Sequence, residues 1–244
     1  MLDVYKSVGR DYGHLTKCQA GPVIFRKDSL LAFLGTIGNS EQIMLEDKLM
    51  RKDKYFPDMM LEGNSVFIQD HYELDMKKYK EEYYSTNFDR KDVDIEQLCH
   101  QYIEGMQWVL TYYTSGCPNW QWFFPQHYAP FASDIAKHIK SYKRVGYGFT
   151  QPTAPFLQLL SVLPPKSANL LPKELEGMFS SKPLVEYCPD KFEVDTSGKK
   201  NEWEGIVLLP ILDRKVIEEE YYRRLKTVDP RDLRRNRIGK SYSY

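Results

Sequence analysis

The chain has 244 residues, with 34 basic and 34 acidic side chains and a formal net charge of zero. Hydrophobic residues make up 42% and aromatic residues 14% of the sequence, which is too high for a disordered chain. No apolar run approaches the roughly 20 residues that cross a bilayer, and the first residues lack the features of a signal peptide. We therefore expect one large or two small globular domains without a membrane span, and no nucleic-acid binding through overall charge.

The first part of the chain predicts helices followed by a charged connector. Residues 1–45 are expected to form helix, loop and helix, with Asp28 and Ser29 available to cap the second helix. Residues 46–80 are polar and rich in lysine, and proline, glycine and asparagine interrupt them. We expect this stretch to pack poorly, with a lysine-rich helix near residues 71–84.

The strongest helix signal begins after Asp94, a favourable N-cap residue. Apolar side chains then recur at spacings of three and four residues, which places them on one face of a helix: Ile95, Leu98, Cys99, Tyr102, Met106, Val109, Leu110 and Tyr113. Ile103, Trp108 and Tyr112 occupy another face, so the helix should be buried on two sides. Gly105 in its middle costs about 1 kcal/mol relative to alanine, and we expect another backbone to approach it closely.

A loop rich in aromatic residues follows this helix, which Gly116 and Pro118 end. It holds Trp120, Trp122, Phe123, Phe124, His127, Tyr128 and Phe131. Two prolines within the loop prevent a regular helix. Ser133 or Asp134 is expected to cap the helix that comes next.

The last third of the chain predicts short elements. Residues 146–172 contain five prolines and should be extended, with a short helix directly after them. Residues 184–187 and 206–209 are strand candidates, and Asp213 can cap a further helix. The basic run at residues 229–237 is interpreted as a solvated arm, with a nucleic-acid contact as the alternative.

These elements together predict a mainly α fold: a multi-helix domain with long ordered loops rich in proline and aromatic residues, and a minor short β element. We divide it into an N-terminal helical segment (1–45), a charged connector (46–90) and an aromatic-rich helical core (91–244).

Residue spacing gives no sign of a metal or nucleotide site. The four cysteines and five histidines lack the closely spaced pairs of a zinc site. The acidic residues are scattered among lysines and arginines, as on solvated helix faces, and do not cluster for Mg²⁺. We expect no cofactor bound by this chain itself.

Trp108 and the aromatic loop leave two interpretations open. Tryptophans bury a large area, so these side chains can form core. They can equally form a surface on which nucleobases stack, at about 1–3 kcal/mol per base and without sequence preference.

A series of motifs then runs through the chain in a fixed order: Glu-Gly-Met-Gln-Trp-Val-Leu at 104–110, Trp-Gln-Trp-Phe-Phe-Pro-Gln-His-Tyr-Ala-Pro at 120–130, Val-Leu-Pro and Leu-Leu-Pro within 162–172, and Trp-Glu-Gly-Ile-Val-Leu-Leu-Pro at 203–210. This order resembles the helical second conserved region of the Xrn-type 5′→3′ exoribonucleases. The resemblance covers nearly the whole chain. Leu160, Thr196, Ser197 and Arg214 depart from the family's usual residues.

The resemblance implies processive degradation of single-stranded RNA that carries a 5′-monophosphate. In the family a catalytic domain supplies Mg²⁺ and hydrolysis, and the helical region packs against it and closes the active-site cavity. The sequence contains no counterpart of that catalytic domain. We therefore expect this chain alone to be inactive, to work with a catalytic domain in cis or in trans, and to expose an apolar docking surface.

The resemblance also implies that an aromatic side chain of this region stacks on an RNA base. The candidates are Trp108, Trp120 and Trp122, followed by His127 and Tyr128. The alternative is a non-catalytic interaction or scaffold module descended from the nuclease. Family members occur in nucleus and cytoplasm, and the sequence does not decide between them.

Overall fold

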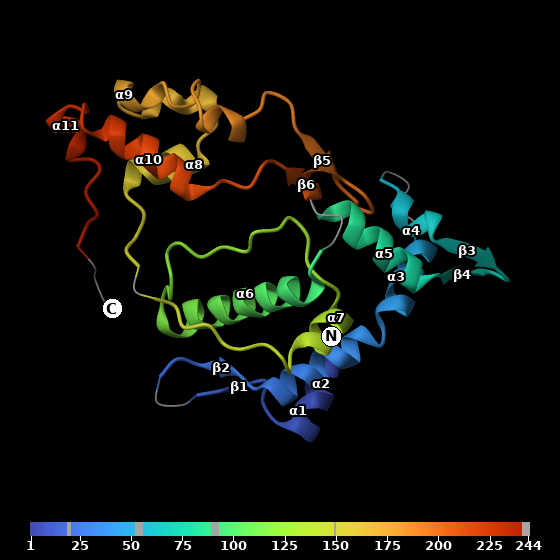
Figure 1. Ribbon diagram of the computed structural model, residues 1–244. Helices are drawn as coiled ribbons and strands as arrows, with labels where there is room; N and C mark the ends of the chain where they lie inside the picture. Colours follow the sequence, from blue (N-terminus) through green and yellow to red (C-terminus); the bar gives the residue numbers. More distant parts are fainter. Residues whose placement is uncertain (19–20, 52–55, 89–92, 149, 241–244) are drawn as a thin grey trace. The chain divides into compact units, whose positions relative to one another are not determined.

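The computed structural model describes residues 1–18, 21–51, 56–88, 93–148 and 150–240 (Figure 1). Most of the regular structure within these ranges is α-helical, and the strands pair only in two-stranded sheets. The predicted mainly α fold with a minor β element is therefore confirmed. None of the described helices combines the length and the apolar character needed to span a bilayer.

The chain divides into two compact units. One comprises Met1–Phe149 with Thr196–Ile206, and the other comprises Thr150–Asp195 with Val207–Tyr244. The division into segments 1–45, 46–90 and 91–244 stays a prediction from the sequence.

The first unit begins with helix α1 (Leu2–Tyr12), a short hairpin of β1 (Thr16–Lys17) and β2 (Ile24–Phe25), and helices α2 (Lys27–Gly38) and α3 (Glu41–Met50). The predicted cap of α2 is wrong, because the helix starts one residue before Asp28 and Arg26 occupies the N-cap position. The hydroxyl of Ser29 is buried and instead donates to the carbonyl of Tyr12 at 3.0 Å. Ser29 thus joins α2 to α1.

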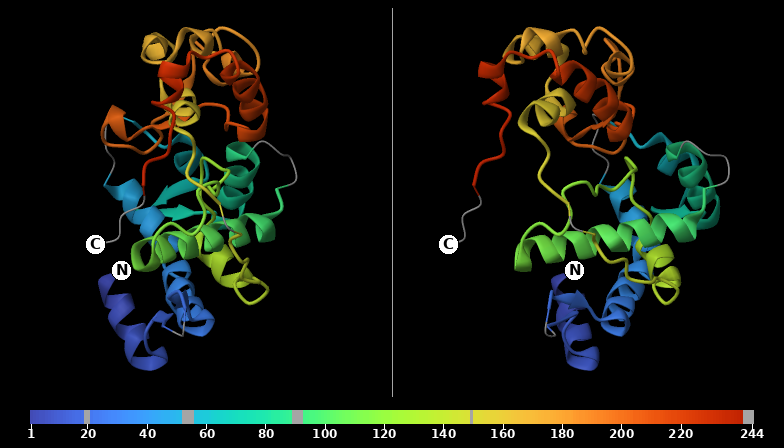
Figure 2. Two further views of the ribbon diagram at one scale, coloured as in Figure 1. Left: turned by 90° about the vertical axis from the view of Figure 1, so that its left-hand side faces the viewer. Right: turned by 60° about the vertical axis from the view of Figure 1, so that its left-hand side comes forward.

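Helix α6 (Ile95–Ser115) is the long helix of this unit and confirms the predicted span. The Asp94 carboxylate accepts from the amide of Gln97 at 2.9 Å, which caps the first turn as expected. Helix α7 (Ala132–His138) packs against both α2 and α6, and the loop between α6 and α7 runs back along α6 (Figures 1 and 2). The three helices enclose a core of Leu30, Leu34, Cys99, Ile103, Ile135, Ala136, Ile139 and Tyr142.

The N-terminus of α7 is capped from a distance. Ser133 and Asp134 lie inside the first turn, so their predicted role as N-cap is wrong. The Glu41 carboxylate of α3 accepts from the amide of Ala132 and from the hydroxyl of Ser133, each at 2.5 Å. This carboxylate accepts hydrogen bonds from the first turn of α7, where a local N-cap side chain would usually be the acceptor.

The predicted connector is folded rather than poorly packed. It contains helix α4 (Met59–Gly63), a hairpin of β3 (Ser65–Ile68) and β4 (His71–Leu74), and helix α5 (Met76–Asn87). A core of Leu49, Leu61, Leu74 and Tyr79 lies between them. The expectation failed because these apolar side chains are spread over several short elements and form no single periodic stripe. Residues 52–55 and 89–90 of this segment lie outside the described residues.

The second unit has its own core. Helices α8 (Pro155–Val162), α9 (Lys173–Glu176), α10 (Arg214–Leu225) and α11 (Pro230–Leu233) contribute to it together with the 3₁₀ turn η1 (Pro165–Leu170). The core comprises Phe156, Leu157, Leu160, Leu171, Leu175, Met178, Phe179, Leu184, Ile217, Tyr221 and Val228. Asp213 caps α10 as predicted. Two helical segments within residues 155–170 correct the expectation of an extended chain there.

The strand predictions for this unit were half correct. Strand β6 (Ile206–Leu208) forms as predicted and pairs with β5 (Glu193–Asp195). Residues Leu184–Tyr187 instead form the 3₁₀ turn η2. Their amides bond locally: the amide of Val185 donates to the carbonyl of Ser181, and that of Glu186 donates to the carbonyl of Pro183. No strand within the described residues pairs with them.

The basic C-terminal run is attached to the second unit. Asn236 donates to the hydroxyl of Tyr221 at 2.7 Å and accepts from the amide of Phe156 at 2.9 Å. The backbone there is thus fixed to the core of this unit, although most of its charged side chains are exposed.

The close approach of α2 to α7 at Gly38 can be tested by substitution. A Cβ added at Gly38 would lie 2.6 Å from Cα of Ser133, whereas one at Gly35 in the same helix would meet nothing within 4 Å. Gly38→Ala should lower the free energy of unfolding by about 1–3 kcal/mol, because the backbone at Ser133 must move to make room for the new Cβ. Gly35→Ala should leave it unchanged or raise it by about 0.5–1 kcal/mol. Urea unfolding of both variants measures this, and equal stability of the two would contradict the close contact.

Candidate functional site

Three aromatic rings stack beside α6. The Trp108 ring lies 5.3 Å from that of Tyr112 at an interplanar angle of 8°, and 6.2 Å from that of Trp122 at 22°. Tyr112 stands one turn after Trp108, and Trp122 covers Gly105, which stands one turn before it. Trp108 therefore lies between two rings and serves to hold them.

Gly105 makes room for this stack. A Cβ at this position would lie 2.7 Å from Cη2 of Trp122. The close approach expected from the sequence is therefore present, but it is made by an aromatic side chain and not by another backbone.

Asn119 fixes the start of the loop. Its side-chain Oδ1 accepts from the amides of Gln121 at 2.7 Å and Trp122 at 2.8 Å. Its carbonyl accepts from Nε1 of Trp108 at 3.0 Å. One residue thus sets the direction of Trp122 and anchors Trp108. The sequence interpretation gave Asn119 no role, although Pro-Asn before an aromatic run is typical of such a side-chain-stabilised turn.

Glu104 lies beneath the same loop. The hydroxyl of Tyr147 donates to its carbonyl at 2.9 Å. Burial raises the pKa of the Glu104 carboxyl, and a hydrogen bond from the Trp122 side chain partly opposes this rise. Ionisation of Glu104 in the folded state is therefore unfavourable and lowers the stability of the fold.

An apolar groove opens along this side of α6. It has a volume of about 550 Å³, and none of the described residues that line it is charged. They are Phe25, Tyr102, Gly105, Met106, Val109, Leu110, Tyr113, Trp122 and Phe124. Tyr113 is 81% exposed, and Val109 is also exposed. We call this surface the aromatic groove. Its lining can contact flat or apolar groups.

The five predicted site residues do not form one surface. Trp108 and Trp122 are in contact, and Trp122 lines the aromatic groove. Trp120 is 49% exposed, and His127 is also exposed. Tyr128 belongs to a second aromatic cluster, with its ring 6.3 Å from Tyr83 and 6.4 Å from Phe88.

Hydrogen bonds hold the second cluster to α7. The hydroxyl of Tyr84 donates to the Asp134 carboxylate at 2.8 Å and accepts from the amide of Phe131 at 3.1 Å. Burial raises the pKa of Tyr84, so the phenol keeps its proton and acts as this donor. Lys80 pairs with the same carboxylate at 2.9 Å. The end of the aromatic loop is thereby attached to α5.

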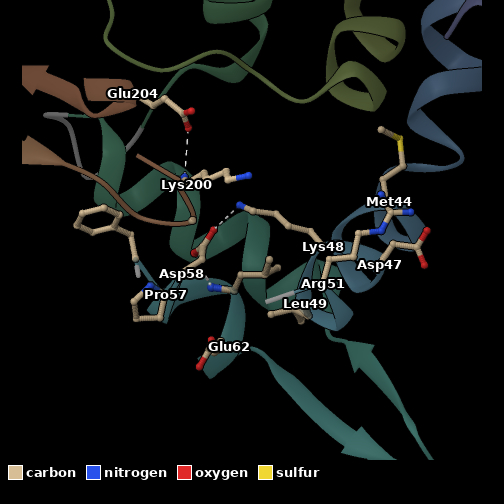
Figure 3. Close-up of a pocket in the computed structure, with 13 residues that line it drawn as sticks. Met44, Asp47, Lys48, Leu49, Arg51, Pro57, Asp58, Glu62, Lys200 and Glu204 are labelled. Atoms are coloured by element: carbon tan, nitrogen blue, oxygen red, sulfur yellow. Dashed lines mark hydrogen bonds and ion pairs between the residues drawn. The ribbon is translucent and has the colours of Figure 1, made fainter. Parts of the chain in front are cut away.

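A polar cavity of about 540 Å³ lies between α3, α4 and the segment around Gly198 (Figure 3). The Lys48 ammonium pairs with Asp58 at 3.0 Å, and the Glu204 carboxylate accepts from the amide of Lys200 at 3.2 Å. Arg51, Asp47 and Glu62 share the lining, so neither sign of charge dominates. This cavity fits a structural junction better than a site for a charged ligand.

Across residues 1–240, apart from the four internal gaps given above, no group of three or more His, Cys, Asp or Glu side chains is placed to hold a metal ion.

Comparison with known proteins gives the family. The family described as the Xrn1 helical domain matches residues 34–244. The chain is 33% identical to 5′-3′ exoribonuclease 1 of Saccharomyces cerevisiae over 198 residues, 74% of the chain and 13% of that protein. It is 33% identical to 5′-3′ exoribonuclease 2 of Candida albicans over 204 residues, 80% of the chain and 20% of that protein. It is 39% identical to 5′-3′ exoribonuclease 1 of Homo sapiens over 155 residues, 62% of the chain and 9% of that protein.

The mainly helical fold and the ordered motifs are thus those of a helical region found in 5′-3′ exoribonucleases. The chain belongs to the Xrn helical-domain family, which confirms the resemblance seen in the sequence. It spans a fifth or less of the length of these curated relatives.

The packing of Trp122 on Gly105 can be tested directly. Gly105→Ala should displace the Trp122 ring, because the new Cβ would lie within 3 Å of it. We expect a changed near-ultraviolet circular dichroism spectrum, since stacked tryptophans dominate that signal, with far-ultraviolet helicity retained. Gly9→Ala in α1, where a Cβ meets nothing within 4 Å, is the matched control. Unchanged near-ultraviolet spectra for both variants would contradict the proposed contact.

The raised pKa of Glu104 predicts that its substitution stabilises the fold in a pH-dependent way. A carboxyl whose folded-state pKa lies above its unfolded value destabilises the fold as pH rises through that interval, because ionisation is harder in the folded state. Glu104→Gln should therefore raise the free energy of unfolding near neutral pH. The gain should disappear below about pH 4, where the unfolded carboxyl is also protonated. Denaturant unfolding at both pH values checks this, and a gain independent of pH would rule out the ionisation effect.

Proposed function

We propose that this chain is the helical region of an enzyme that degrades 5′-monophosphorylated RNA processively from its 5′ end, releasing nucleoside monophosphates. Membership of the Xrn helical-domain family and the similarity to 5′-3′ exoribonucleases support this proposal. In this proposal the region closes the active-site cavity and offers aromatic side chains to the bases of single-stranded RNA.

The aromatic groove is the observation that carries the stacking role. Trp122 has Trp108 on one side and borders the groove, which contains only apolar and aromatic side chains. An aromatic ring held in place by a neighbour loses little entropy on stacking with a base, and every base has a face that can stack. We assign stacking to Trp122, with Trp120 as a second contact.

The other predicted residues receive supporting roles in this proposal. Trp108 lies between two rings and positions Trp122. Tyr128 and His127 lie further along the loop, and Tyr128 packs in the second cluster, so both would contact the cavity wall rather than a stacked base.

Hydrolysis is assigned to a separate catalytic domain, in cis or in trans. That domain would hold Mg²⁺, which activates water and stabilises charge at the cleaved phosphate. The described residues of this chain provide no comparable set of ligands, and we propose that the chain alone does not cleave RNA. We place the enzyme in the nucleus or the cytoplasm.

A non-catalytic interaction module is the second candidate. Trp203 is 82% exposed on the short turn η3 (Glu202–Glu204), and exposed tryptophans are typical anchors of protein interfaces. A scaffold would depend on such residues and not on the aromatic groove.

Tryptophan variants in a complex with a catalytic domain distinguish these roles. Trp122→Leu should weaken binding of single-stranded 5′-phosphorylated RNA roughly 5- to 150-fold, the equivalent of about 1–3 kcal/mol for one stacked base. Fluorescence anisotropy measures the affinity, and nucleotide release per binding event measures processivity. Trp203→Leu is the control and should match the wild type.

Two results would contradict the proposal. Equal RNA affinity and processivity of Trp122→Leu and wild type would remove the stacking role. Release of nucleoside monophosphate by the isolated chain with Mg²⁺ would remove the assignment of hydrolysis to another domain.

A further inference from the structure

A basic cavity lies on the first unit where the β1–β2 hairpin and the start of α2 meet α6. Its volume is about 510 Å³. Its basic side chains are Lys17, Arg26, Lys27 and Arg144, and Asp28 is its one acidic side chain among the described residues. A chain with formal net charge zero therefore gathers a net charge of plus three around one cavity.

The basic side chains of the cavity differ in whether they bond to other parts of the fold. Lys27 donates to the carbonyls of Lys140 and Tyr142, so it is engaged in holding α2 to the end of α7. Lys17 and Arg144 are exposed and form no ion pair with a described residue. Like charges held together without a counter-charge raise the electrostatic free energy of the empty cavity. An anion would remove that repulsion.

The floor of the cavity is apolar. Leu30, Ile103 and Ile139 are each at most 3% exposed, and the rings of Phe25 and Tyr142 border the same space. Phe25 is partly exposed, so its ring is the apolar surface that a ligand would reach. A ligand with a flat or apolar body and a negatively charged end would contact this ring and the basic side chains together.

One polar feature faces the same region. Helix α2 begins here without a side-chain cap, which leaves backbone amides and the positive end of the helix dipole. These amides add to the attraction that the basic side chains exert on an anion.

The basic cavity adjoins the aromatic groove. Phe25 lines both, and α6 supplies Ile103 and Gln107 to the cavity and Tyr102 and Met106 to the groove. The Gln107 side chain, which accepts from the amide of Phe25 and donates to the carbonyl of Val23, fixes this shared wall. A flat group against Phe25 can therefore lie near a phosphate in the cavity.

We propose that the basic cavity binds the phosphate end of a nucleotide, with the base against Phe25. The phosphate can belong to a free nucleoside monophosphate or to a nucleotide within an RNA strand. This site is separate from the stacking role of Trp122 and does not depend on the exoribonuclease assignment.

The test compares two charge-matched double variants of the full chain. Lys17→Gln/Arg144→Gln removes two cavity charges, whereas Lys140→Gln/Lys143→Gln removes two charges from side chains that do not line the cavity. Calorimetric titration with adenosine 5′-monophosphate, adenosine, inorganic phosphate and a short single-stranded RNA gives the affinities. Urea midpoints of both variants confirm that they fold.

We expect the monophosphate to bind the wild type more tightly than adenosine or phosphate alone, and more weakly as salt rises. The cavity variant should lose about fivefold or more in affinity, and the control variant less than about twofold, as expected for removing two directly contacting charges. If the cavity variant loses affinity for the mononucleotide, the ligand of the cavity is a free nucleotide. If it loses affinity for the RNA alone, the ligand is a phosphate within an RNA strand.

Three results would overturn the inference. They are equal losses in the two double variants, equal binding of adenosine and its monophosphate, and no loss with either ligand in the cavity variant.

Discussion

The Glu41 carboxylate at the start of α7 is the contact on which the first unit depends. It accepts from the amide of Ala132 and the hydroxyl of Ser133, both at 2.5 Å. The Lys80 ammonium donates to the same hydroxyl at 2.6 Å and pairs with Asp134 at 2.9 Å. Side chains from α3 and α5 therefore converge on one helical turn of α7. Because charge-assisted hydrogen bonds are the stronger ones and these are partly shielded from solvent, they determine where α7 begins and how it lies on α2.

This anchor gives order to a loop that has no regular structure. The aromatic loop is held at its far end by α7 and at its near end by Asn119, whose side chain orients the amide of Trp122. Between these points the indole ring of Trp122 fills the space that Gly105 leaves on α6. Prolines restrict the backbone and lower the entropy lost on ordering it. A loop fixed at both ends can therefore hold large rings in place without a sheet or helix of its own.

The sequence predicted the features that depend on near neighbours. The Asp94 cap reaches only three residues ahead, and the stripe on α6 repeats every three or four residues, so both could be recognised. Gly105 indicated a close approach, but nothing local showed that the partner is a ring seventeen positions later. The Glu41 contact joins residues more than ninety positions apart, so the sequence around Ser133 gave no sign of it, and the prediction of a local cap there was wrong. The four-residue apolar run at 184–187 fits a strand or a tight turn equally well, and only its surroundings decide. The ordered motifs, in contrast, were sufficient to identify the family.

Net charge hides how charge is arranged on this chain. The sum of zero argues against a chain that binds nucleic acid along its whole surface. Yet the aromatic groove contains no charged side chain, the polar cavity of Figure 3 mixes both signs, and the basic cavity holds four cationic side chains against Asp28. Aromatic side chains offer apolar faces to a base, and basic side chains attract phosphate. Since Phe25 lines both of these surfaces, α6 and the β1–β2 hairpin place an apolar surface next to a positive one in a chain whose net charge is zero.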